Sequence, residues 1–210
     1  MTIALVAIVL AIGAGAVVAV STREPGAAAI GLAVALVGSA LLADPLPSAS
    51  ILGVRVVAGL LAATLIRSGI RGSERQPSPL GWPAEAMLAT AGAIAGLGVA
   101  VALEGLDASV GFTTGGDAGT AVLTLMALAT AAGTSLLVLG AAPTIHGRPG
   151  MRRAVGLVLL TQAVLLIRVG VAGPAVDLEE VARAALLVAA AATGTALARA
   201  GAANAGATPE

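Results

Sequence analysis

The stretch Val155–Gly173 reads VGLVLLTQAVLLIRVGVAG and decides the fold class of this chain. It is almost continuously apolar over about the 20 residues that an α-helix needs to cross roughly 30 Å of hydrocarbon. A backbone in hydrocarbon must satisfy its own hydrogen bonds, so a run of this length is expected to be a helix and not an open sheet. The sequence therefore predicts a transmembrane helix here.

Comparable apolar runs follow one another along the rest of the chain. Proline-containing polar segments separate them, as at Ser21–Gly26, Asp44–Ser50 and Arg71–Pro83. The first run lacks a basic segment before it, so we expect a mature helix and not a cleaved signal. We expect an all-α polytopic membrane helix bundle, with one transmembrane domain over 1–202 and a cytoplasmic tail at 203–210. The seven predicted spans are 3–20, 27–43, 51–66, 83–103, 120–142, 155–173 and 181–200.

The composition agrees with a membrane protein and excludes several other classes. Of the 210 residues, 58% are hydrophobic and 10% are charged, whereas a soluble domain carries about 25% charged residues. A disordered chain, a nucleic-acid-binding protein and a disulfide-rich secreted module are therefore excluded. The chain has no cysteine, so thiolate catalysis and iron–sulfur ligation are excluded as well. His146 has no second ligand near it in the sequence, and we expect no metal site, no cofactor and no catalytic residue.

The arginines alternate with the acids from one connection to the next. Arginine lies in segments 21–26, 67–82 and 143–154 and near the C-terminus, while the intervening segments carry Asp and Glu. Positively charged segments stay on the cytoplasmic side of a membrane. We therefore expect a multi-pass protein of the cell membrane, with its N-terminus outside and its C-terminus in the cytoplasm.

Ionisable residues inside predicted spans are the first candidates for a functional site, because charge is costly in hydrocarbon. No Asp, Glu, Lys or His lies near the middle of a predicted span, so a self-sufficient proton or sodium pump is not expected. Three arginines fall within spans toward the outer leaflet, and Glu179 forms an i, i+4 pair with one of them. These residues either serve an anion pathway or a contact with a partner protein, or they snorkel and pair at the interface. The candidates are Arg55, Arg168, Glu179, Glu180 and Arg183.

Two neighbouring residues, Thr161 and Gln162, form the most polar point near the middle of a span. Gln162 is expected to hydrogen-bond to a neighbouring helix; the alternative is that it lines a polar path. Threonines in span 120–142 are expected to bond the carbonyl groups of their own helix. The sequence Gly92-Ala-Ile-Ala-Gly96 suits close packing between helices.

Three stretches resemble a known family. They are Ser50–Leu60 (SILGVRVVAGL), Arg152–Gln162 (RRAVGLVLLTQ), and Pro174 followed by Glu179 and Glu180. Together they resemble the E-type membrane subunits of hydrogenase-4 and formate hydrogenlyase complexes, a family related to the small K-type membrane subunits of complex I. In this resemblance Arg55 stands where the family has Lys, and Thr161 and Gln162 stand where it has Glu and Asn. The acid of the last family helix falls near Ala185.

The resemblance implies a non-catalytic scaffold subunit of a complex I-like or group 4 hydrogenase-like membrane complex. Other membrane subunits would pack against its small-residue helix faces, and proton movement would belong to those neighbours. The alternative is a small multi-pass transporter or channel for an anionic or small polar solute, with Arg55, Arg168 or Arg183 meeting the anion. A membrane-embedded enzyme ranks last, because no paired catalytic groups converge.

Overall fold

The computed structural model describes residues 2–22, 24–42, 47–69, 82–109, 125–146, 150–173 and 175–205. The regular secondary structure in these ranges is helical throughout, which confirms the all-α prediction. The helices are α1 (Thr2–Ser21), α2 (Pro25–Leu41), α3 (Ala49–Gly69), α4 (Trp82–Ser109), α5 (Leu125–His146), α6 (Met151–Ala172) and α7 (Asp177–Ala205).

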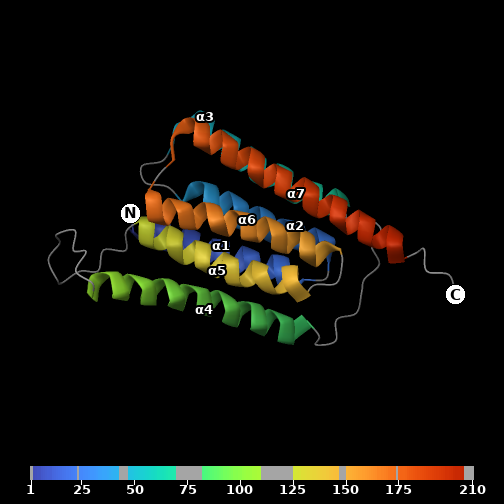
Figure 1. Ribbon diagram of the computed structural model, residues 1–210, viewed down its shortest axis with the longest axis horizontal. Helices are drawn as coiled ribbons and strands as arrows, with labels where there is room; N and C mark the ends of the chain where they lie inside the picture. The colour runs from blue at the N-terminus through green and yellow to red at the C-terminus, as the bar shows by residue number, and fades with distance from the viewer. Residues whose placement is uncertain are drawn as a thin grey trace.

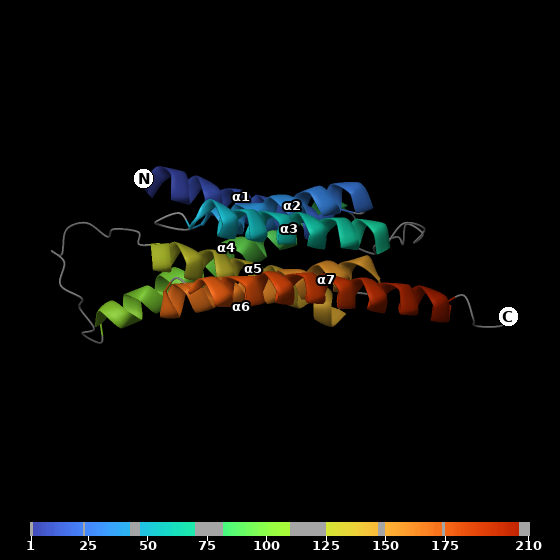
Figure 2. The same cartoon turned by 90° about the horizontal axis from the view of Figure 1, so that it is seen from above.

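The helices run along the long axis of the molecule, each antiparallel to the one before it (Figure 1). Seen from above, α1, α2 and α3 form one layer, and α5, α6 and α7 form a second (Figure 2). Contacts join α1 to α5, α2 to α6 and α3 to α7 across the layers, and α4 packs at one edge against α1 and α5. The bundle therefore places the end of α2, the start of α3, the end of α6 and the start of α7 close together.

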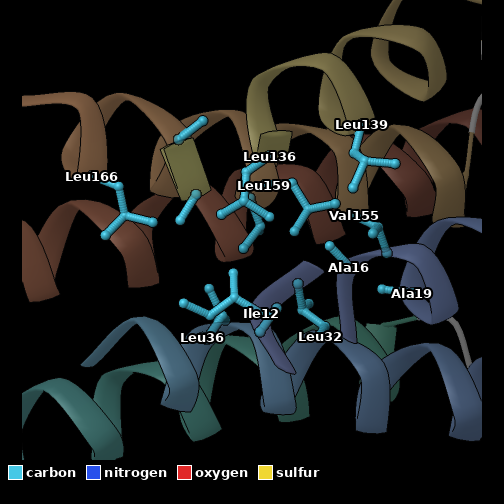
Figure 3. Packing of buried hydrophobic residues seen from close by; sticks show 14 of the residues in the cluster. Ile12, Ala16, Ala19, Leu32, Leu36, Leu136, Leu139, Val155, Leu159 and Leu166 are labelled. Atoms are coloured by element: carbon cyan, nitrogen blue, oxygen red, sulfur yellow. The ribbon is translucent and has the colours of Figure 1, made fainter. Parts of the chain in front are cut away.

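The apolar core lies between the two layers. Figure 3 shows Ile12 and Leu36 of the first layer facing Leu136 and Leu159 of the second, and all four are at most 2% exposed. Many other large apolar side chains face outward, where water would disfavour so large an apolar surface. They include Ile3, Ile30, Met87, Val164, Val171 and Leu197. An apolar exterior around an apolar core is typical of a helix bundle in lipid.

Glycines let several helices approach each other backbone to backbone. A Cβ added to Gly15 of α1 would lie 2.7 Å from the carbonyl oxygen of Gly31 of α2, closer than real Cβ contacts. A Cβ added to Gly96 would meet the backbone of Ser135 on α5, so the close packing predicted for the Gly92–Gly96 motif is confirmed. Small residues at such crossings are typical of membrane helices, because packing replaces the hydrophobic effect between them.

Threonine hydroxyls in α5 bond mainly to their own helix, as the sequence predicts. Thr130 donates to the carbonyl oxygen of Met126, and Thr134 lies 2.9 Å from the carbonyl oxygen of Thr130. The Thr134 hydroxyl is also 2.8 Å from the carbonyl oxygen of Gly96, which adds a polar contact to the α4–α5 crossing. Thr120 and Thr124 of the predicted threonine run lie outside the described residues.

Five helices are long and apolar enough to span a membrane: α1, α3, α5, α6 and α7. The apolar stretches of α2 and α4 are shorter, Pro25–Leu41 and Ala86–Gly98. At 1.5 Å per residue, α2 is about 25 Å long, less than the roughly 30 Å of hydrocarbon. The described residues form seven helices, one for each predicted span, and five of these helices meet this criterion for a membrane span.

Several helix ends differ from the predicted span ends, because charged residues and a proline continue the helices. Helix α6 begins at Met151 and not at 155, and α7 begins at Asp177 and not at 181. Helix α5 continues through Pro143 to His146, since a proline in a helix removes one hydrogen bond without having to end it. Helix α7 runs to Ala205, so residues 203–205 of the predicted tail are helical; the remaining tail and 120–124 lie outside the described residues.

Replacing Gly15 by alanine tests the backbone contact between α1 and α2. We expect Gly15→Ala to lower the free energy of unfolding by about 1–3 kcal/mol, the usual cost of overpacking. The matched control is Gly13→Ala, where an added Cβ meets nothing within 4 Å and helix propensity favours alanine by up to about 1 kcal/mol. Unfolding in a mild detergent, followed by circular dichroism, measures both. Equal effects of the two variants would contradict the close contact.

Candidate functional site

Five charged side chains from three helices meet at one end of the bundle, and we call them the ionic cluster. Its centre is Glu180, which is only 4% exposed. The carboxylate oxygen Oε2 of Glu180 accepts a hydrogen bond from Nε of Arg55 at 2.7 Å. Its other oxygen, Oε1, accepts one from Nη1 of Arg183 at 3.0 Å. The pairing of Arg55 with Glu180 joins α3 directly to α7.

Glu179 forms the outer half of the ionic cluster and is more exposed than Glu180. Arg168 contacts its carboxylate at two points: Nη2 donates a hydrogen bond to Oε2, and Nε forms an ion pair with Oε1, each at 2.7 Å. Arg183 donates from Nη2 to Oε1 of Glu179 at 2.8 Å, which confirms the predicted i, i+4 pair. Such two-point contacts fix orientation as well as charge, so α6 is joined to α7 in a defined register.

The ionic cluster also satisfies backbone groups at helix ends. The last carbonyl groups of a helix lack partners within it, and Arg168 donates from Nη1 to the carbonyl oxygen of Gly173 at the end of α6. Arg55 donates from Nη1 to that of Ala40 in the last turn of α2, at 3.4 Å. Glu179 and Glu180 lie in the first turn of α7, where the helix dipole favours negative charge. Gly173 has a φ of 78°, a conformation that favours glycine.

Gln162 makes a buried polar contact between the two layers. Its Nε2 donates to the hydroxyl oxygen of Ser39 on α2 at 2.8 Å, and that hydroxyl donates to the carbonyl oxygen of Leu36 at 2.7 Å. The predicted bond from Gln162 to a neighbouring helix is therefore confirmed. Thr161 instead donates to the carbonyl oxygen of Leu157 in its own helix. Only the second residue of the predicted polar pair thus connects helices.

A cavity of about 330 Å³ lies between α2, α3, α6 and α7, beside the ionic cluster. Its polar lining consists of Arg55, Glu180 and Arg183 of the ionic cluster, and of Gln162 with its partner Ser39 in the last turn of α2. Leu36, Leu166 and Leu187 supply apolar walls, and Pro47, Ser48, Ala175 and Asp177 lie toward the ends of the connections. We call this space the four-helix cavity.

The structure brings four of the seven predicted site residues to the four-helix cavity. These are Arg55, Gln162, Glu180 and Arg183, whereas Arg168, Glu179 and Thr161 do not line it. Sequence reasoning missed Ser39 entirely, because one serine in a small-residue helix carries no distinguishing signal. It also missed the pairing of Arg55 with Glu180, which are 125 residues apart in the chain.

Among the described residues, no group of three or more His, Asp or Glu side chains is arranged to hold a metal ion. The acids of the ionic cluster are engaged by arginines on their carboxylate oxygens. The chemistry available at this site is therefore hydrogen bonding and charge pairing by guanidinium, carboxylate, amide and hydroxyl groups.

Comparison with known proteins returns no relative. No family model, no curated protein and no solved structure matches this chain. The resemblance to the hydrogenase-4 membrane family therefore stays a prediction from three short stretches of sequence.

Removing the carboxylate of Glu180 tests the importance of the ionic cluster. We expect Glu180→Ala to lower the free energy of unfolding by about 3–5 kcal/mol, because Arg55 is largely buried and would lose its carboxylate partner. Asp177→Ala removes an exposed acid from the same helical turn, and its expected cost is below about 1 kcal/mol, the usual helix-dipole contribution. Thermal or denaturant unfolding in detergent compares the two. Similar losses in both variants would show that the cluster does not hold the helices.

Proposed function

We propose that all seven helices cross the cell membrane, with the N-terminus outside and the C-terminus in the cytoplasm. In support of this, α2 and α4 lie alongside the five longer apolar helices over most of their length (Figure 1). Arg67 lies in the last turn of α3, Arg152 and Arg153 lie in the first turn of α6, and Arg199 lies near the end of α7. These arginines therefore share the end of the bundle away from the ionic cluster. Arginine-rich ends are retained in the cytoplasm, which assigns the ionic cluster to the outer side.

We further propose that the chain is a non-catalytic scaffold subunit of an energy-converting membrane complex built from several chains, complex I-like or group 4 hydrogenase-like. One observation carries this proposal. Every Asp and Glu in the described helices lies within two turns of a helix end, and Glu180, which is buried at 4% exposed, is engaged by two arginines. A protein that moves protons or cations by itself needs an ionisable group at depth. Such groups would belong to its neighbours.

The spatial arrangement of the three family-like stretches supports the same proposal. Arg55 from the first stretch, Gln162 from the second and Glu180 from the third all line the four-helix cavity. Positions far apart in the chain thus form one structural unit, as is expected if they were retained together from a common ancestor. In this resemblance Arg55 stands where the family has Lys and Gln162 where it has Asn, whereas Thr161, in the place of the family's membrane Glu, does not line the cavity.

Contact with other subunits is supported by small residues that do not pack against any described part of this chain. Most glycines with close neighbours pack inside the bundle, but a Cβ added to Gly53 or Gly98 would meet nothing within 4 Å. Both glycines lie at exposed positions, on α3 and α4. A helix of another protein can approach closely at such positions.

A second candidate function is a small transporter or channel for an anionic or small polar solute. The four-helix cavity favours it, because guanidinium and amide groups line a space that reaches from the helix ends toward the middle of the bundle. This candidate needs a pathway through the membrane, whereas the scaffold needs only a stable surface.

A C-terminal fusion to green fluorescent protein tests the orientation and the scaffold role in one experiment. The fusion is expected to fluoresce, because this reporter folds in the cytoplasm. Extraction from native membranes in a mild detergent is expected to recover the chain with larger membrane subunits at a constant ratio. A variant of the same fusion, carrying Gly98→Leu, tests the surface of α4. It is expected to lose the partner subunits if α4 provides the contact.

Two results would contradict these proposals. A dark C-terminal fusion together with a fluorescent N-terminal one would reverse the orientation. A monodisperse single chain that moves an anion across liposomes, with flux abolished by Arg55→Ala, would replace the scaffold with the transporter.

A further inference from the structure

The arginines of the four-helix cavity have hydrogen-bond donors to spare. A guanidinium group carries five N–H donors. Arg55 uses Nε and Nη1, and Arg183 uses Nη1 and Nη2. Nη2 of Arg55 and Nε of Arg183 therefore have no acceptor among the described residues. Both side chains are largely buried, 19% and 10% exposed, but neither nitrogen is among the fully buried atoms without a partner. Because both residues line the cavity, these donors are accessible to a ligand in it.

The charged groups that line the four-helix cavity differ in their exposure. The guanidinium groups of Arg55 and Arg183 and the carboxylate of Glu180 are largely buried. Asp177, the other described acid in the lining, is exposed and so screened by water and salt. The buried part of the lining therefore carries one positive charge in excess, which favours an anion that brings acceptor atoms with it.

The shape of the cavity limits what that anion is attached to. About 330 Å³ lies at the lower end of the range for small-molecule sites. Along α7, Leu187 lies seven residues beyond Glu180, which is about 10 Å in a helix. Apolar walls occupy this interval, and Gln162 lies at its inner end with Oε1 free of any donor among the described residues. The site therefore suits an oxyanion followed by a short apolar segment.

We propose that the four-helix cavity binds an oxyanion group, a carboxylate or a phosphate, on Arg55 and Arg183, with the rest of the molecule extending toward Gln162. Guanidinium groups match the planar, two-point geometry of such anions. The anion comes either from a small organic solute or from the head group of an anionic phospholipid. The site belongs to this chain alone, so it stands whether or not the scaffold role does.

The test measures thermal unfolding of the full purified chain by circular dichroism. In a neutral detergent, sodium butyrate and sodium phosphate are titrated against sodium chloride at equal ionic strength. In a second arm, the chain is placed in nanodiscs of phosphatidylcholine with or without phosphatidylglycerol. A saturable rise in the melting temperature with butyrate or phosphate identifies a free solute, and a rise with phosphatidylglycerol alone identifies a lipid head group. Either result supports the site.

Two matched variants assign the effect to the cavity. Ala184 lines it and Ala185 is exposed on the same helix, so Ala184→Leu fills the cavity without removing a charge, and Ala185→Leu is the control. We expect Ala184→Leu to raise the half-saturation concentration at least 10-fold and Ala185→Leu to leave it unchanged.

Arg55→Lys provides an independent variant should Ala184→Leu fail to fold. It keeps the charge beside Glu180 but loses the planar fork, and we expect binding to weaken about 10-fold. The proposal is overturned if neither the two anions nor phosphatidylglycerol raises the melting temperature of the unaltered chain. It is also overturned if Ala184→Leu and Arg55→Lys both retain the full rise.

Discussion

The arrangement of this bundle depends on the burial of one carboxylate, that of Glu180. At 4% exposed, it is stable as an anion only if paired, because an unpaired charge away from water costs several kcal/mol. Its partners come from α3 and from its own helix, so the requirement for pairing holds the start of α7 against α3. Through Arg183 and Arg168 the same network reaches α6. One desolvated acid thereby sets the relative positions of three helices.

The remaining helix contacts are close but carry little directional information. Glycine and alanine faces allow α1 to approach α2, and α4 to approach α5, backbone to backbone. In lipid such contacts gain dispersion energy but no stabilisation from the hydrophobic effect. Small side chains also interdigitate little, so they fix the register of two helices only weakly. The ionic cluster and the bond from Gln162 to Ser39 are directional. We therefore expect them to select one packing among several of similar energy, a role that buried polar groups have in some other proteins.

Much of this arrangement was predictable from local patterns, and the rest depends on contacts between distant residues. Long apolar runs predicted the seven helices, and the positions of Arg55, Arg168 and Arg183 within successive spans predicted that they lie toward one side. The spacing of Glu179 and Arg183 predicted their pairing. No local pattern predicts that Arg55 selects Glu180 at a separation of 125 residues, or that Gln162 selects Ser39 at 123. The predicted span ends were wrong for a related reason. Hydropathy excludes the charged first turn of α7, although the helix dipole and the arginines stabilise this turn as helix.

The coupling energy between Arg55 and Glu180 tests the central claim most directly. A double-mutant cycle compares the free energies of unfolding of the unaltered chain, Arg55→Met, Glu180→Met and the double variant in one detergent. If the pair holds α3 against α7, the double variant is expected to lose less than the sum of the single losses by at least about 1 kcal/mol, within the range for directly interacting residues. Losses that add to within about 0.3–0.5 kcal/mol, as for independent sites, would contradict it.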